Sequence, residues 1–267
     1  MEELKTTALV INERQLGEAD KLLTMLTPHH GKLLVSGKGV SSLRSRHMAA
    51  CQIFCYSDYV FRKTKKYYYI SDSDTQDCFF DIRFDVLKVA LATYMCDVAC
   101  DLSLEGIEDE ELFRLMLNSL YALSYKKNLS VDHIKSAFEF RAAVQGGFLP
   151  VLDCCGVCGR DTADEFVVFD VMNGIYRCAH CTSVIEKEGI DPNGTAEIYH
   201  RLNRTVLTAL RFIASAPLTR FLSFSIPEED EELLGVFCES YLVSHLEHTF
   251  ASLKYYKNIK LGGTYYE

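Results

Sequence analysis

The feature that most constrains this chain is a change in its hydrophobic period near residue 81. Before that point, short runs of β-branched and aromatic residues are separated by turn formers, notably Pro28–Gly31 and Gly37–Gly39. Such runs predict β-strands. We expect five strands: Thr6–Asn12, Lys21–Thr27, Lys32–Gly37, Gln52–Arg62 and Tyr67–Ser71. Five short strands within residues 1–80 favour a small closed β-barrel of the oligonucleotide-binding (OB) type.

After Asp81, apolar residues recur every three to four positions, which is the period of an amphipathic α-helix. Three helices are expected between residues 84 and 145. Residues 151–182 break the pattern, and helical spacing returns from Ile198 to Ile213 and again from Leu233 to Phe250. The sequence therefore predicts a barrel followed by a helical body with one insertion.

Two cysteine pairs inside that insertion are the strongest local signal in the chain. Cys155-Gly-Val-Cys158 is followed, after 19 residues, by Cys178-Ala-His-Cys181. Each pair can place two thiolates on one ion from a tight turn. A short hairpin, Phe166–Asp170 with Gly174–Arg177, is expected to set the pairs face to face. Four thiolates complete a tetrahedral shell with no position for water, so we expect a structural zinc ion rather than a catalytic one.

The alternatives at this site are cysteines without a metal, or a redox role. Cys154 and His180 adjoin the expected ligands, and either could replace one of them. The remaining cysteines are expected to be small core or surface residues: Cys51, Cys55, Cys78, Cys96, Cys100 and Cys238. The chain shows no secretory signal and no membrane span, so a cytoplasmic location is expected, where cysteines are normally reduced.

The predicted fold class is α+β, with four parts in chain order. They are an N-terminal OB-fold β-barrel that binds DNA (1–80), the first part of an α-helical domain (81–150), an inserted four-cysteine zinc module (151–182) and the second part of the helical domain (183–260).

Charge is spread unevenly over these parts. The formal net charge is -9, yet residues 1–80 hold 11 Lys and Arg against 9 Asp and Glu, so the rest of the chain carries -11. Binding depends on the local field, so nucleic acid can bind to the barrel alone. The expected DNA-binding residues are Lys32, Lys38, Arg44, Arg46, Arg62, Lys63, Lys65, Lys66 and Tyr67. Their cations would meet phosphates while tyrosine rings stack on bases.

The competing interpretation of the same residues is a solvated hairpin tip whose tyrosines pack the barrel. Because strand side chains alternate between two faces, Tyr67, Tyr68 and Tyr69 cannot all face outward.

Signs of catalysis are missing from the sequence. It contains no glycine-rich phosphate loop, no nucleophile elbow and no paired carboxylates at a strand end. The scattered histidines show neither metal-ligand nor triad spacing. We therefore expect a protein that is not an enzyme and whose barrel binds DNA. The alternative is a non-catalytic protein-interaction scaffold that uses the acidic helical body.

Three parts of the chain resemble the bacterial RecO family. The first is Ala8–Thr27, with its Gly17-Glu-Ala-Asp20 turn and leucine-rich strand, followed by Gly31, Lys38-Gly39 and Ser45. The second is Phe138-Glu-Phe-Arg141 with Gly147, Leu149 and Pro150. The third is the pair of cysteine knuckles, which is similar to the zinc-bearing branch of the family. The order of these parts covers essentially the whole chain.

The resemblance implies a mediator of recombinational DNA repair. Such proteins bind single- and double-stranded DNA and anneal complementary strands. They act with RecR and RecF to load RecA on strands coated by single-strand-binding protein, and they contact that protein's C-terminal tail. Arg141, beside Phe138 and Phe140, is a candidate to meet the tail's carboxylate. The alternative is an arginine that supports the zinc module or a helix end.

Overall fold

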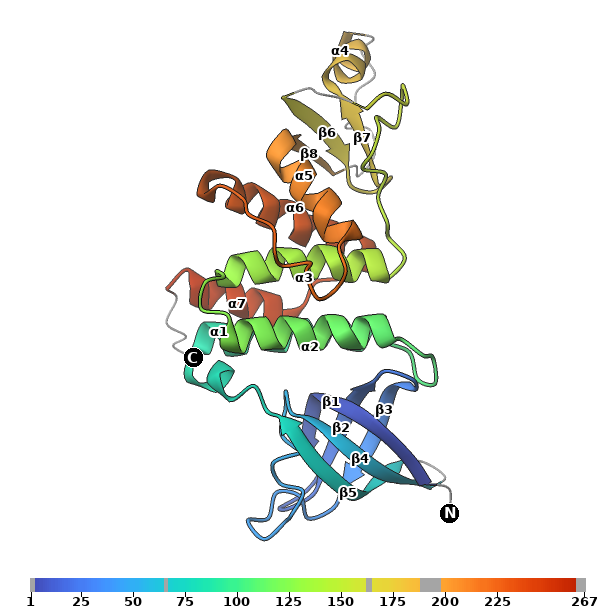
Figure 1. Cartoon of the computed structure of the whole chain (residues 1–267), viewed down its shortest axis with the longest axis vertical. Coiled ribbons are helices and arrows are strands. Elements are labelled where there is room, and N and C mark those ends of the chain that lie inside the picture. The colour runs from blue at the N-terminus through green and yellow to red at the C-terminus, as the bar shows by residue number, and fades with distance from the viewer. Residues whose placement is uncertain (1–2, 65–66, 162–164, 188–197, 263–267) are drawn as a thin grey trace. The chain divides into compact units, whose positions relative to one another are not determined.

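A computed structural model describes residues 3–64, 67–161, 165–187 and 198–262 (Figure 1). The chain forms two compact units. The first holds Met1–Val131 together with Phe250–Glu267, and the second holds Asp132–Thr249. The C-terminal segment therefore belongs with the beginning of the chain. The four-part division expected from the sequence stays a prediction.

The first unit contains a closed five-stranded barrel, which confirms the predicted fold of this part of the chain (Figure 1). Its strands are β1 (Glu3–Gln15), β2 (Lys21–Thr27), β3 (Gly31–Gly37), β4 (Tyr56–Lys63) and β5 (Tyr68–Asp77). They follow the order β1-β2-β3-β5-β4, and the parallel pairing of β3 with β5 closes the barrel. Alternation along β3 turns Leu33 and Val35 inward, where they join Phe61 in the apolar core.

The fourth strand begins at Tyr56 rather than at Gln52, as the sequence predicted. Residues 51–55 form turns instead, because Phe54 has a φ of 69°, which no strand accommodates. The Phe54 amide donates to the Val10 carbonyl at 2.9 Å, and this bond ties the turn to β1.

Cys55 and Cys78 form a disulfide within the first unit. The prediction of reduced cysteines is wrong for this pair, and the strand register explains why. Strands β4 and β5 are antiparallel with Tyr56 opposite Asp77, so the residues that flank this pair lie side by side. The bond joins positions 23 residues apart and restrains the unfolded chain.

Helices complete the first unit. They are the short 3-10 helix η1 (Phe80–Phe84) and the α-helices α1 (Val86–Leu102), α2 (Glu110–Tyr125) and α7 (Ala251–Lys260). The side chains of Asp85 and Asp109 cap α1 and α2 by accepting from first-turn amides. Helix α7 packs on α1, where the rings of Tyr94 and Phe250 meet edge to face with centroids 5.5 Å apart.

The second unit combines helices with a three-stranded sheet in the order β7-β6-β8 (Figure 1). Its elements are α3 (Val131–Gln145), β6 (Phe166–Asp170), β7 (Ile175–Cys178), α4 (Ala179–Lys187), β8 (Tyr199–Asn203), α5 (Arg204–Ser215) and α6 (Glu228–Leu246). The predicted β6–β7 hairpin is confirmed. Phe169 of β6 packs against Phe237 and Tyr241 of α6, with ring centroids 4.9 and 6.1 Å apart.

Two segments predicted to be single helices differ in the structure. The segment from Ile198 to Ile213 begins as strand β8, in which Leu202 pairs with Val167 of β6. Ile198 and Leu202 are an even number of residues apart, so they share a face in a strand as well as in a helix. Helix α5 starts only after Asn203, whose side chain accepts the Val206 amide at 2.9 Å.

The second difference concerns the predicted helix from Leu233 to Phe250. Helix α6 ends at Leu246, and Glu247 adopts the left-handed conformation, with φ of 56°. Phe250 is instead the N-cap residue of α7. The break separates a helix of the second unit from one of the first.

Candidate nucleic-acid interface and metal site

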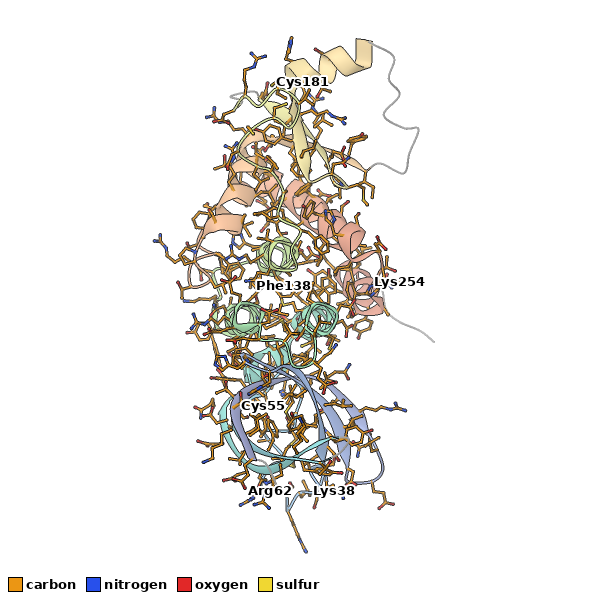
Figure 2. All side chains as sticks on the ribbon, turned by 90° about the vertical axis from the view of Figure 1, so that its right-hand side faces the viewer. Lys38, Cys55, Arg62, Phe138, Cys181 and Lys254 are labelled. Atoms are coloured by element: carbon orange, nitrogen blue, oxygen red, sulfur yellow. A yellow bond between two sulfur atoms is a disulfide. The ribbon has the colours of Figure 1, made fainter. Side chains whose placement is uncertain are left out.

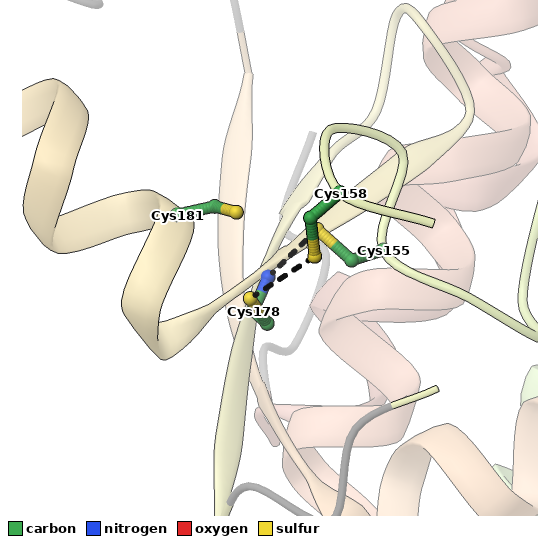
Figure 3. Close-up of side chains that lie close together, drawn as sticks. All are labelled: Cys155, Cys158, Cys178 and Cys181. Carbon is green, nitrogen blue, oxygen red and sulfur yellow. Dashed lines mark hydrogen bonds between the residues drawn. The ribbon is translucent and has the colours of Figure 1, made fainter. Parts of the chain in front are cut away.

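Four cysteine side chains of the second unit converge (Figure 3). Cys155 and Cys158 lie on the turn before β6, Cys178 ends β7, and Cys181 lies in the first turn of α4. Their sulfur atoms all lie within 4.8 Å of one another, and those of Cys158 and Cys178 are 3.9 Å apart. A tetrahedral site with Zn–S bonds of about 2.3 Å places its sulfurs about 3.8 Å apart. The cluster therefore fits a four-thiolate metal site.

Glycines shape the turn that carries the first cysteine pair. Gly159 has a φ of +69°, and its amide donates to the Cys155 carbonyl at 2.9 Å. A Cβ added to Gly156 would lie 2.8 Å from Cβ of Ile175. Glycine at 156 therefore lets the turn approach β7 closely enough for its thiols to reach Cys178.

Backbone amides favour the thiolate at Cys155. Burial opposes its ionisation, but hydrogen bonds from the amides of Cys158, Cys178 and Val157 outweigh burial and lower the pKa of Cys155 to about 6. The Cys178 amide donates to the Cys155 sulfur at 3.3 Å. Because a thiolate is the form that binds metal, this turn prepares the site for a cation.

The two residues considered as replacement ligands lie outside the cluster. Among the residues that the structure describes, the group contains neither Cys154 nor His180. The side chain of Cys154 is half-buried and that of His180 is exposed.

Basic and aromatic side chains meet at one end of the barrel, where β3, β4 and β5 come together. Figure 2 shows Lys38 and Arg62 at this end and Cys55 at the other. The register places Tyr69 beside Ser36 of β3 and beside Arg62 of β4. The ammonium of Lys38 lies 5.3 Å from the Tyr69 ring centroid.

A second lysine–tyrosine pair occupies the other face of the same strands. Lys63 lies opposite Tyr68, with its ammonium 5.6 Å from the ring centroid. Tyr68 also packs against the barrel core and meets Phe61 edge to face. Tyr68 is thus partly a core residue, as the alternation argument required. Tyr67 is half-buried, and its carbonyl accepts hydrogen bonds from the amide and hydroxyl of Thr64.

Two predicted arginines already hold anionic partners. Arg62 and Glu3 form an ion pair at 3.2 Å, in which both side chains are about half exposed. Arg46 donates to the Ser71 carbonyl at 2.8 Å and lies 3.6 Å from Asp72. Exposed ion pairs of this kind are weak, so a phosphate can exchange for the carboxylate.

The other predicted DNA-binding residues of the barrel lie in different surroundings. Arg44 is exposed. Lys32 points away from the basic end, because its ammonium donates to the carbonyl of Cys100 in the last turn of α1 at 2.6 Å. Lys65 and Lys66 lie outside the described residues.

Strand β5 limits the size of this surface. Beyond Tyr69 it continues through Asp72, Asp74 and Asp77, and Asp74 pairs directly with Asp58 of β4. The predicted strand Tyr67–Ser71 is therefore too short, because β5 continues to Asp77 through an acidic half. The charged residues of β5 are all acidic and lie beyond Ser71, so the positive charge of Lys38 and Lys63 is confined to the end of the barrel where β5 begins.

Arg141 lies in the interior of the second unit. Its side chain is buried, and its Nη1 donates to the carbonyls of Ile213 and Ala214 in the last turn of α5. These carbonyls have no partner within their own helix, so the guanidinium satisfies a helix end. The predicted partner-binding role of Arg141 stays a prediction.

None of the described helices is both long enough and apolar enough to span a membrane.

Comparison with known proteins finds one family along nearly the whole chain. The family described as "Recombination protein O N terminal" matches residues 1–79, and "Recombination protein O C terminal" matches residues 83–254. The chain is 30% identical to the DNA repair protein RecO of Acetivibrio thermocellus over 259 residues, covering 97% of this chain and 98% of that protein. It is 28% identical to the DNA repair protein RecO of Desulforamulus reducens over 255 residues, or 95% of each chain.

Proposed function

This chain belongs to the RecO family, and on that premise we propose that it is a DNA-binding mediator of recombinational DNA repair. It binds and anneals single-stranded DNA and also contacts double-stranded DNA. With RecR, and with RecF, it helps to load RecA on strands coated by single-strand-binding protein, whose C-terminal tail it contacts. It acts in the cytoplasm, and it catalyses no covalent reaction. The names of the relatives support a role in DNA repair, and strand annealing and RecA loading are our extension of that role.

One observation supports DNA binding most directly. Two lysine–tyrosine pairs, Lys38 with Tyr69 and Lys63 with Tyr68, lie at the same end of the barrel. Lysines neutralise phosphates, and tyrosine rings offer faces on which bases stack regardless of sequence. Both features suit a protein that holds single strands without reading them.

The four cysteines support a structural zinc ion. Cys155, Cys158, Cys178 and Cys181 would hold it with four thiolates and leave no position for water or substrate. The ion would then fix the hairpin and the turn before it, and it would take no part in chemistry.

The DNA-binding proposal is tested by reversing two charges. Lys38→Glu combined with Lys63→Glu should weaken binding of a fluorescent deoxythymidine oligonucleotide at least tenfold at low salt, as measured by anisotropy. Each lost phosphate contact should also flatten the salt slope of log K by about 0.7.

The matched control carries the same change in net charge elsewhere in the first unit. Lys127 and Lys254 are both exposed, and Figure 2 shows Lys254 away from the end that holds Lys38. Lys127→Glu with Lys254→Glu should bind nearly as the unmodified protein does. Equal losses in the two double variants would reject the barrel end as the DNA surface.

The alternative function, a protein-interaction scaffold, rests on the net charge of -11 carried by residues 81–267. It predicts that the unmodified protein ignores oligonucleotides even in dilute buffer.

A further inference from the structure

The sheet of the second unit brings two arginines onto one face. Strand β6 runs between β7 and β8, and Val168 of β6 pairs with Arg177 on one side and with Arg201 on the other. Directly paired residues share a sheet face. The other face turns inward, because Val167 and Phe169 of β6 are buried.

Arg201 stacks on an aromatic ring of the same sheet, and Arg177 lies close to another ring, to whose hydroxyl its Nη1 donates at 3.5 Å. The guanidinium carbon of Arg201 lies 3.5 Å from the Phe166 ring centroid, and that of Arg177 lies 5.3 Å from the Tyr199 centroid. Arg201 is exposed, so the planar group that rests on Phe166 is open to solvent. We name these four residues, Phe166, Arg177, Tyr199 and Arg201, the arginine platform.

The electrostatic surroundings favour an anion. Residues 198–227 contain four arginines and neither aspartate nor glutamate, although the chain as a whole is acidic. The Arg177 side chain is only 20% exposed, and the fully buried carboxylate of Asp170, 3.6 Å away, offsets its charge. Glu165, immediately before β6, is an exposed carboxylate beside Phe166, and Glu197 lies outside the described residues. The positive charge offered to solvent here therefore comes from the exposed side chains of Arg201 and Arg204.

A shallow hollow of about 410 Å³ has Arg204, the residue that follows β8, in its lining. It is lined by Thr205, Thr208 and Phe212 of α5, among others. This volume lies in the range of small-molecule sites, and its lining combines a cation, hydroxyls and an aromatic ring.

We propose that the arginine platform, with Arg204 and the adjoining hollow, is a second surface for single-stranded nucleic acid. A guanidinium already held on a ring loses little freedom when a base stacks on its open face, and its N–H edge donates to phosphate. Acidic peptides would use the charge but not the stacking planes. The inference deepens the proposed function and rests on it, since it adds a strand contact to the one at the barrel.

The test measures oligonucleotide anisotropy with full-length variants that carry a normal metal content. Arg201→Glu with Arg204→Glu should weaken deoxythymidine oligonucleotide binding about tenfold. The control, Arg220→Glu with Lys254→Glu, changes the charge equally at exposed positions that lie outside the platform and should have a much smaller effect.

Stacking is separated from charge by Arg201→Lys, which keeps the cation and removes the plane. This variant should lose about threefold in affinity for the oligonucleotide and nothing for an abasic oligonucleotide of the same length. A zero-length photo-crosslink from 4-thiothymidine should map to the peptides that carry Phe166 or Tyr199.

Failure of this inference differs from failure of the proposed function. If the unmodified protein binds and the Arg201/Arg204 variant matches its control, the platform is not a strand surface, whereas the barrel proposal stands. If that variant loses affinity for polyglutamate but not for the oligonucleotide, the surface serves an acidic protein and the inference is overturned. If the unmodified protein binds no oligonucleotide, both fall.

Discussion

Replacing Cys155 with serine should remove the zinc that we propose for the four cysteines and abolish the cooperative unfolding of the second unit. Structural zinc contributes about 10–16 kcal/mol of binding free energy in small zinc modules, and that free energy is folding free energy. Cys155 accepts the Cys178 amide and anchors the turn that carries Cys158. Its loss therefore disrupts both knuckles. Metal analysis of the purified protein together with a thermal melt measures the effect.

The neighbouring cysteine supplies a matched control. Cys154 lies outside the four-sulfur group, so Cys154→Ser should retain about one zinc per chain and a melt close to that of the unmodified protein. A Cys155→Ser protein that keeps its zinc and its melting temperature would show that the four cysteines are not a metal site.

Replacing Lys135 with methionine should destabilise the second unit by about 3–5 kcal/mol. The Lys135 ammonium lies 2.8 Å from Glu139 and 2.9 Å from Glu239, and the Glu139 side chain is fully buried. In the methionine variant, the buried carboxylate of Glu139 loses the positive charge that compensates its own. Urea denaturation monitored by circular dichroism measures the difference.

The pH dependence of this contribution has a definite sign. Burial opposes the charge on Lys135, but Glu139 and Glu239 outweigh burial and raise its pKa above the ordinary value of 10.5. The charge on Lys135 therefore stabilises the folded protein fully at pH values below the pKa of this lysine in the unfolded chain. This stabilisation is lost as the pH rises through its pKa in the folded protein. On the alkaline side, the lysine and methionine proteins should therefore differ most near neutral pH and converge as the pH rises through the folded pKa of Lys135.

An exposed ion pair with the same helical spacing provides the comparison. Arg114 and Glu110 also lie four residues apart, but their side chains are 64% and 45% exposed. Arg114→Met should cost less than about 0.5 kcal/mol, because solvent screens such pairs. Equal losses for Arg114→Met and Lys135→Met would contradict the assignment of Lys135 to a buried network.

Local patterns were sufficient to predict the barrel and the cysteine cluster. Strand β2 has the predicted bounds, Lys21–Thr27, because an apolar run between turn formers leaves the backbone few alternatives. The four cysteines come together as their spacing predicted, since two short knuckles on one hairpin have few other arrangements.

Features that depend on strand register could not be predicted. Cys55 and Cys78 look isolated in the sequence, and only the pairing of Tyr56 with Asp77 brings them together. Arg177 and Arg201 are likewise neighbours only because Val168 lies between them. Pairing between distant strands is a tertiary property that no short window of residues contains.

Lys32 and Arg141 show a second limit. Lys32 was predicted to meet DNA, yet it donates to a carbonyl at the end of α1, and Arg141 donates to carbonyls at the end of α5, which was the alternative considered for it. A long cationic side chain can reach solvent or a helix end from the same backbone position. The choice depends on which helices pack nearby.

The central claim is that cations at one end of the barrel hold the phosphates of a single strand. The most direct test is the affinity of the unmodified protein for a deoxythymidine oligonucleotide between 50 and 200 mM salt. If the protein contacts about four phosphates, log K should fall with log salt concentration with a slope near -3, and the affinity should fall roughly 50-fold across that range. Absent binding at 50 mM salt, or an affinity that does not respond to salt, would contradict the claim.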